Sequence, residues 1–257
     1  MDMPAYKLFR KGGKKADYSA LLKEAQKADV ILYDNLACKE LLDLAGDHCE
    51  KIYVGKKPYG AYTTQDTIHR LIKHYAFSRG NVLRLKGGDP FIFGRGFEEV
   101  IFAREQGIET EYIPGISSMQ ASGFSDIPLT HRGISESVWA ITGTKKDGSL
   151  SSDLQLAIKS KATVVIYMGM KKLMEIATAY ITSGKGDMPA AIIQDGSLCK
   201  QQHLRCKVKD LPHASFTAGL SNPAIIIIGN VVKVSEHINA NSLNMMNILP
   251  IGKSSNS

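Results

Sequence analysis

The 257-residue sequence has few cysteines and no long apolar run. Its cysteines form no CxxC pair and lie at no metal-ligand spacing from a histidine, so we expect reduced thiols and no metal site. They are Cys38, Cys49, Cys199 and Cys206. No apolar stretch reaches the roughly 20 residues of a membrane helix, and the polar N-terminus lacks the apolar core of a signal peptide. We therefore expect a cytoplasmic protein that does not enter a membrane.

Two nucleotide-binding motifs are also absent. No GxxxxGK[ST] sequence of a P-loop occurs. The glycine-containing loop after residue 86, GGDPFIFGRG, is longer than the GxGxxG fingerprint of dinucleotide-binding folds and differs from it. Both absences argue against a P-loop nucleotidase and against a dinucleotide-dependent enzyme.

Positive charge is in excess, but the excess is local. The formal net charge is +7 and the pI about 9.1. Residues 1–27 hold seven Lys/Arg and three Asp/Glu, so +4 of the +7 lies there. No aromatic–basic recognition motif accompanies this charge, so we expect no nucleic-acid partner.

Residues 28–115 alternate between strand and helix patterns. Short apolar runs predict strands at 28–35, 50–56, 81–89 and 109–115. Between them, apolar residues at helical spacing predict helices at 37–46, 63–80 and 96–107. This alternation is typical of an α/β fold with a mostly parallel sheet and helices on its faces.

The second half of the chain is less regular. We predict strands at 137–143, 162–169, 190–196 and 223–232, and a helix at 171–184. Turn-forming residues at 115–135 indicate a hinge, and the segment after residue 240 has no pattern. We therefore predict an N-terminal α/β domain at 1–115, a C-terminal α/β domain at 116–240 and a tail at 241–257.

Glycines and polar side chains gather where the predicted strands of the first half end. These strand ends carry Asp34, Gly55-Lys56, Gly87-Gly88-Asp89, and Gly115 followed by Ser117-Ser118. In an open parallel sheet, ligands bind beyond the carboxyl ends of the strands, and glycines let a ligand approach the main chain. A tight turn would explain any one of these loops. Four adjacent strand ends of the same character favour a binding site.

The segment GGDPFIFGRGFEE at 87–99 strongly resembles the uroporphyrinogen-III C-methyltransferase family of the tetrapyrrole methylases. The resemblance extends over residues 28–232 and includes ADVILYDNL, IYVGK, IPGISS, IPLTHRG, Tyr167-Met168 and NPAIIIIG. It implies a two-domain tetrapyrrole methylase fold, with a mostly parallel N-terminal sheet and a mixed C-terminal sheet, and usually a homodimer. The implied reaction transfers methyl groups from S-adenosylmethionine (SAM) to C2 and C7 of uroporphyrinogen III, giving precorrin-2 on the way to sirohaem and cobalamin.

The resemblance also implies site residues. The SAM pocket would comprise Gly87, Gly88, Asp89, Ile92, Ser117, Ser118, Met168, Gly196 and Ala224. The family's proton acceptor and donor fall on Asp34 and Lys56, although Lys56 could equally be a clamp for a substrate carboxylate. Because the substrate carries eight carboxylates, Arg95, His131 and Arg132 are candidates to bind them, and each could instead be a surface charge.

The N-terminal segment departs from the family pattern. The family opens with a strand and a GxGPGDPxLLT loop, whereas residues 5–30 read AYKLFRKGGKKADYSALLKEAQKADV. The loop's proline falls on Lys11 and its aspartate near Gly13, so neither is kept. Thr144 also replaces a usual histidine. The alternative is a degenerate member that binds SAM or a tetrapyrrole without turnover. An RNA methyltransferase and a corrin methylase acting at another position fit the residues less well.

Overall fold

The computed structural model describes residues 5–9, 18–37, 39–55 and 63–235. The chain divides into two compact units, Met1–Ser118 and Met119–Ser257. Within the described residues, each unit contains one five-stranded sheet.

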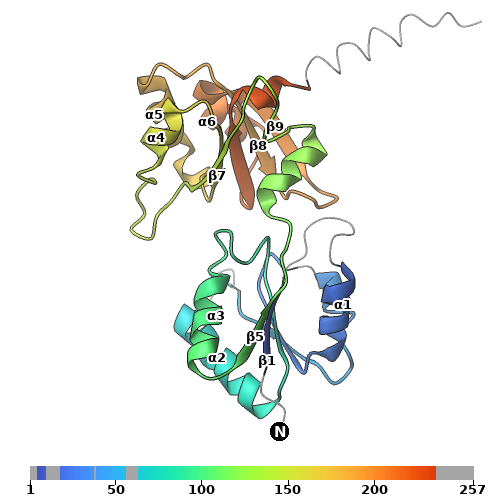
Figure 1. Ribbon diagram of the computed structural model, residues 1–257. Helices are drawn as coiled ribbons and strands as arrows, with labels where there is room; N and C mark the ends of the chain where they lie inside the picture. The colour runs from blue at the N-terminus through green and yellow to red at the C-terminus, as the bar shows by residue number, and fades with distance from the viewer. Residues whose placement is uncertain (1–4, 10–17, 38, 56–62, 236–257) are drawn as a thin grey trace, which may run out of the picture. The chain divides into compact units, whose positions relative to one another are not determined.

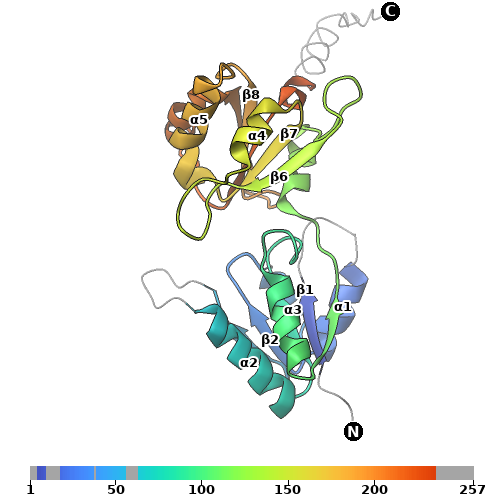
Figure 2. The same ribbon diagram turned by 60° about the vertical axis from the view of Figure 1, so that its left-hand side comes forward.

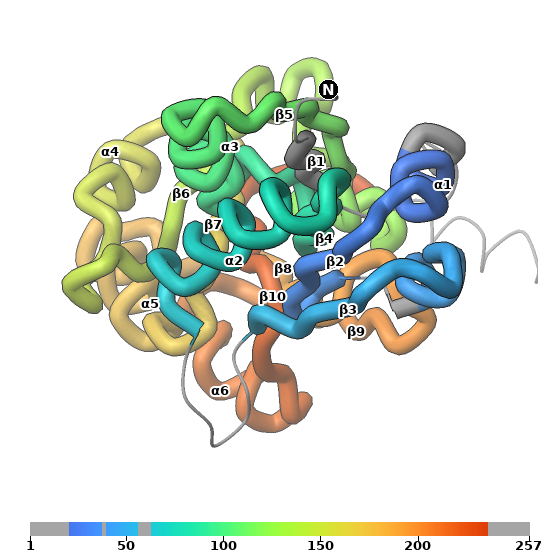
Figure 3. The backbone as a smooth tube through the Cα atoms, turned by 90° about the horizontal axis from the view of Figure 1, so that it is seen from below, coloured from blue at the N-terminus to red at the C-terminus, as the bar shows by residue number. Residues whose placement is uncertain are grey.

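The sheet of the first unit is parallel throughout. Its strands are β1 (Ala5–Phe9), β2 (Val30–Tyr33), β3 (Glu50–Tyr53), β4 (Val82–Leu85) and β5 (Glu109–Tyr112). They lie in the order β3-β2-β4-β1-β5, which Figure 3 shows from one end of the sheet. All four strand pairs are parallel, so the carboxyl ends of the strands share one edge.

Helices cover both faces of this sheet (Figure 1). On one face α2 (Gln65–Ser78) and α3 (Gly96–Glu105) pack against Val30, Leu32 and Val82. On the other face α1 (Tyr18–Lys27) packs in a cluster with Ile31, Leu83 and Leu85. Because successive strand residues point to opposite faces, runs such as Val30-Ile31-Leu32 supply both clusters.

The sheet of the second unit is mixed. Its strands are β6 (Val138–Thr142), β7 (Thr163–Tyr167), β8 (Pro189–Gln194), β9 (Gln202–Lys207) and β10 (Ala224–Ile228), in the order β6-β7-β10-β8-β9. Among these described strands, only β6 and β7 pair in parallel. The helices α4 (Leu154–Lys159), α5 (Leu173–Thr182) and α6 (Leu211–Thr217) share one apolar cluster with the sheet. Figure 2 shows α4 and α5 next to this sheet. The predicted α/β class, with a parallel first sheet and a mixed second sheet, is confirmed.

Short 3₁₀ helices complete the described secondary structure. They are η1 (Lys39–Leu41), η2 (Ser118–Ser125), η3 (Met170–Lys172), η4 (Val208–Asp210) and η5 (Asn230–Lys233). Of these, η2 lies in the segment where turn-formers predicted a hinge, and η5 occupies the end of the range predicted as a strand at 223–232.

The predicted helix at 37–46 is wrong. Its described residues form only η1 followed by turns. The chain enters this segment through a turn in which Asp34 accepts the backbone N–H groups of Leu36 and Ala37. It then buries Leu41 and Leu42 in the cluster beneath α1. A ten-residue helix is marginal by itself, so these tertiary contacts override the helical pattern.

The sequence patterns also missed several elements in both halves of the chain. Neither β1 nor α1 was predicted, since the predicted strands and helices begin at residue 28. The exposed, polar edge strand β9 and the short helices α4 and α6 were missed as well. Among the described helices, none is long and apolar enough to span a membrane.

Candidate functional site

The carboxyl edge of the first sheet brings together most of the predicted site residues of that unit. Asp34 directly follows β2, and the 87–89 turn follows β4 by one residue. The segment from Gly115 to Ser118 follows β5. Because β2, β4 and β5 belong to one parallel sheet, these loops share an edge. Lys56 lies outside the described residues.

The two glycines after β4 are there for different reasons. A Cβ on Gly87 would lie 2.1 Å from the Cβ of Leu36, in the loop after β2, so this glycine permits close packing of two strand-end loops. Gly88 has φ = +92°, a backbone conformation that side chains disfavour. The pair thus lets the chain turn sharply against the neighbouring loop.

Asp89 is buried, and its carboxylate is held by the protein. Its Oδ1 accepts the N–H of Phe91 at 2.9 Å. Its Oδ2 accepts the Tyr112 hydroxyl at 2.6 Å and the Gly115 N–H at 3.2 Å. The Asp89 carbonyl accepts the N–H of half-buried Ile92 at 3.2 Å. Asp89 therefore organises the turn after β4 and binds the loop after β5.

Asp34 presents a partly exposed carboxylate in a fixed orientation. Its Oδ1 accepts the Leu36 N–H at 3.1 Å, and its Oδ2 lies 3.3 Å from Nη2 of Arg84. The Arg84 side chain is 2% exposed and also donates to the carbonyls of Leu32 and Leu85. A carboxylate offers about four acceptor positions, so Asp34 keeps free acceptor capacity towards solvent.

A buried ionic network lies behind Asp34. The Glu99 carboxylate, which is fully buried, pairs with Nε of Arg84 and with Nζ of Lys86, both at 3.2 Å. It also accepts a hydrogen bond from Gln65 at the start of α2. Burial and the nearby Arg84 lower the pKa of Lys86. Asp34 is thus the most exposed member of a chain of alternating charges that joins β2, β4 and α3.

Three predicted cofactor residues of the second unit also share an edge. Met168 follows β7, Gly196 follows β8, and Ala224 begins β10. Since β10 is antiparallel to both β7 and β8, Ala224 pairs with Gln194 and Ile225 pairs with Tyr167. The register therefore places these three residues side by side.

Backbone strain gathers at this second edge. Met168, Asp195 and Ser197 adopt the left-handed conformation, with φ of +55°, +51° and +70°. The Met168 side chain is half exposed, and its carbonyl accepts the Thr144 hydroxyl at 2.9 Å. Such conformations in non-glycine residues cluster at ligand sites.

The helix η2 packs against the loops at this second edge. The Tyr167 hydroxyl accepts the N–H of Met119 at 3.1 Å, and a Cβ on Gly196 would lie 2.7 Å from that of Ala121. Ser117 is buried and half-buried Ser118 begins η2. The two serines therefore lead from the edge of the first sheet into this helix.

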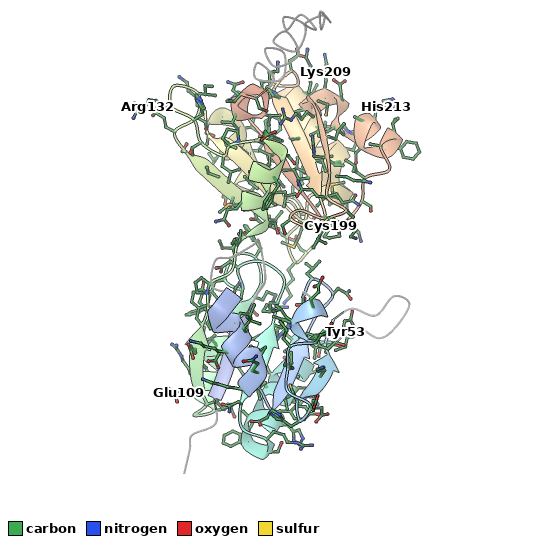
Figure 4. The ribbon with its side chains drawn as sticks, turned by 90° about the vertical axis from the view of Figure 1, so that its right-hand side faces the viewer. Tyr53, Glu109, Arg132, Cys199, Lys209 and His213 are labelled. Atoms are coloured by element: carbon green, nitrogen blue, oxygen red, sulfur yellow. The ribbon has the colours of Figure 1, made fainter. Side chains whose placement is uncertain are left out.

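The candidate substrate residues lie in different places. Arg95 belongs to the loop before α3, where its guanidinium forms a bidentate pair with Glu98. His131 and Arg132 are exposed and belong to a turn closed by Ser135, which bonds to Thr163 at the amino end of β7. Cys199 lies in the loop after β8. Figure 4 shows Arg132 at the opposite end of the second unit from Cys199. The structure does not bring His131 and Arg132 to the edge of Met168.

A family model described as Tetrapyrrole (Corrin/Porphyrin) Methylases matches residues 20–212. The chain belongs to the tetrapyrrole methylases. This family assignment confirms the resemblance carried by residues 28–232. Together with the similar enzymes described below, it identifies the chain as a methyltransferase.

Two relatives illustrate the similarity in sequence. The uroporphyrinogen-III C-methyltransferase of Bacillus subtilis is 42% identical over 214 residues, which cover 82% of this chain and 83% of that enzyme. The sirohaem synthase of Chromobacterium violaceum is 40% identical over 219 residues, 84% of this chain and 47% of that protein. The chain thus spans about half the length of the sirohaem synthases that it matches.

Solved structures of methyltransferases are similar to this chain in fold. A uroporphyrin-III C-methyl transferase from Thermus thermophilus, complexed with S-adenosylhomocysteine, has a TM-score of 0.76 and 33% identity, over 90% of this chain and 99% of that one. A cobalt precorrin-4 methyltransferase has a TM-score of 0.74 at 20% identity, over 89% and 95% of the chains, and shares the fold.

Sequence reasoning missed the residues that support the site. Arg84 and Lys86 were treated as part of a strand, although two cations two positions apart in an apolar run were a signal that buried acids face them. Glu99 was noted only within the family motif. Tyr112 gave no signal, because its partner Asp89 is 23 residues away in the sequence.

Proposed function

We propose that the chain is a SAM-dependent C-methyltransferase that converts uroporphyrinogen III to precorrin-2 by methylation at C2 and C7. The observation that carries the proposal is the carboxyl edge of the first sheet, where an oriented, partly exposed Asp34 lies on the same edge as the 87–89 and 115–118 loops. The 42% identity to the Bacillus uroporphyrinogen-III C-methyltransferase supports this substrate.

The predicted cofactor residues suit a ligand bound largely by the main chain. Gly88, a glycine in a left-handed backbone conformation, places no side chain over the turn, and Met168 is half exposed with φ = +55°. We assign SAM to the loops that contain Gly87–Asp89, Ile92, Ser117, Ser118, Met168, Gly196 and Ala224. The S-adenosylhomocysteine bound to the Thermus neighbour supports this choice. Bound SAM supplies an electrophilic methyl group.

Asp34 is the proposed proton acceptor. Methylation of a pyrrole carbon leaves a proton that must depart, and a carboxylate with free acceptor positions can receive it. Arg84 and the Leu36 N–H hold the carboxylate in one orientation, which favours transfer at a defined position. Lys56 stays a proposed proton donor or carboxylate clamp.

Basic side chains are proposed to bind the substrate carboxylates. Arg95 lies in the loop between the glycine turn and α3, and a substrate carboxylate would compete there with Glu98. For His131 and Arg132 the same role stays a prediction, and their position at the amino end of β7 does not add support.

We also propose a cytoplasmic homodimer, with domains at 1–115 and 116–240 and a tail at 241–257.

Anaerobic incubation with SAM and uroporphyrinogen III tests this proposal. We expect a product carrying two added methyl groups by mass spectrometry. Asp34→Asn keeps the shape of the side chain but removes its basicity, so its turnover should fall about 100-fold or more. Its affinity for S-adenosylhomocysteine should stay within about twofold of the wild type.

Two results would contradict the proposal. Binding of S-adenosylhomocysteine by the wild type without any methylated product would favour the degenerate member, which the altered segment at 10–17 already suggests. That segment lies outside the described residues. Full turnover by the Asp34→Asn variant would remove the assigned proton acceptor and leave the reaction class intact.

A further inference from the structure

The Asp89 carboxylate joins two loops of the first unit. One oxygen accepts the Phe91 N–H within the loop after β4. The other oxygen accepts the Tyr112 hydroxyl at 2.6 Å and the Gly115 N–H at 3.2 Å, both from the chain around the end of β5. Three of about four acceptor positions are thus used within the protein. Since Asp89 is 7% exposed, little of its carboxylate is left for a ligand.

The ring of Tyr112 packs against the same loop that contains the Asp89 carboxylate. It ends β5, an edge strand of the parallel sheet. Its ring stacks on that of Phe91, with centroids 4.0 Å apart and planes 10° apart. Phe91 in turn meets Phe97 of α3 edge-on at 5.3 Å. The hydroxyl and the ring of Tyr112 therefore contact the same loop after β4.

We infer that Tyr112 is a positioning residue of the cofactor site, because its hydroxyl bonds through Asp89 to fix the 87–92 loop and the 113–118 loop relative to each other. The inference rests on the proposed function, which assigns SAM to both loops. Asp89 then affects cofactor binding mainly by ordering the backbone around Phe91 and Gly115, whose N–H groups it accepts. The cofactor would meet main-chain groups whose spacing depends on a tyrosine that need not touch it.

The ionisation of Tyr112 agrees with this geometry. Burial, the hydrogen bond to Asp89 and the negative charge of Asp89 together raise the pKa of Tyr112 to about 12. The phenol therefore stays protonated, and donates to the carboxylate, throughout the physiological range.

The variant Tyr112→Phe tests the inference, because it removes the hydroxyl and keeps the ring that stacks on Phe91. We expect its dissociation constant for S-adenosylhomocysteine, measured by calorimetry, to rise about five- to tenfold, in line with the loss of one typical hydrogen bond. The KM for SAM should rise similarly while kcat changes less than about twofold, since the reacting groups are untouched.

Tyr75→Phe is the matched control. Tyr75 also donates to a carboxylate, that of Glu50, at 3.3 Å. Glu50 begins β3 and therefore lies at the amino end of the same sheet, away from the cofactor loops. This variant should bind S-adenosylhomocysteine as the wild type does.

A double-mutant cycle with Asp89→Asn separates the indirect role from direct contact. If Tyr112 acts through Asp89, the double variant binds about as weakly as Asp89→Asn alone. A Tyr112→Phe variant that binds as tightly as the wild type, with the wild type binding normally, overturns this inference and leaves the proposed function standing. A wild type that does not bind S-adenosylhomocysteine overturns the proposed function, and the inference with it.

Discussion

Single residues at the carboxyl edge of the first sheet have packing roles that a motif does not reveal. Gly87 looks like a residue kept small for a ligand. In the structure the space beside its Cα is taken by Leu36, whose Cβ would be only 2.1 Å from an added methyl group. The glycine thus serves contact between two loops of the protein, and any effect on the ligand passes through them.

Replacement of Gly87 by alanine should therefore destabilise the protein and weaken cofactor binding together. Overpacking of this size costs about 1–3 kcal/mol in the free energy of unfolding, which denaturant titration would measure. Gly123 is the control, because an added Cβ there meets nothing within 4 Å. Gly123→Ala should be neutral or slightly stabilising. Equal stability of the two variants would contradict the packing role of Gly87.

Adjacent residues of one helix can differ greatly in energetic weight. In α3, Glu98 is exposed and pairs with Arg95, which lowers the pKa of Glu98 mainly through their hydrogen bond. Glu99 is fully buried and pairs with two cations. Exposed pairs contribute little to stability, whereas loss of one partner from a buried pair leaves uncompensated charge.

The pair of variants Glu99→Gln and Glu98→Gln tests this contrast. We expect Glu99→Gln to lower the free energy of unfolding by about 3 kcal/mol or more. Glu98→Gln should cost at most about 1 kcal/mol. Because Glu99 holds Arg84, which orients Asp34, the soluble fraction of Glu99→Gln should also lose turnover. A small stability effect at both positions would show that the buried network is dispensable.

At the scale of the whole molecule, the excess of positive charge matches the chemistry of the proposed substrate. The chain carries a formal net charge of +7, of which +4 lies in residues 1–27. A substrate with eight carboxylates would be attracted by this field, whereas SAM has no comparable negative charge.

Salt should therefore separate the two ligands. Between about 50 and 500 mM NaCl, the KM for uroporphyrinogen III should rise several-fold because added ions screen exposed charges. The dissociation constant for S-adenosylhomocysteine should change less than about twofold in the same range. Steady-state kinetics and calorimetry at each salt concentration would measure both, and a KM independent of salt would contradict electrostatic attraction.

Local patterns determined much of this protein. The alternation at 28–115 and the runs Val30–Leu32 and Ile225–Ile228 predicted a parallel first sheet and buried strands of the second, because the spacing of apolar residues follows directly from helix and strand geometry. The clustering of Asp34, Gly88 and Asp89 at one edge followed from the shared direction of parallel strands.

Tertiary structure decided the contacts that hold this edge together. Arg84 reaches Asp34 across 50 residues of sequence because the order β3-β2-β4-β1-β5 makes β2 and β4 neighbours. Tyr112 reaches Asp89 across 23 residues, and the packing of Leu41 and Leu42 replaced a predicted helix by turns. Such pairs depend on which strands adjoin and which side chains are buried together, and no local period in the sequence encodes either.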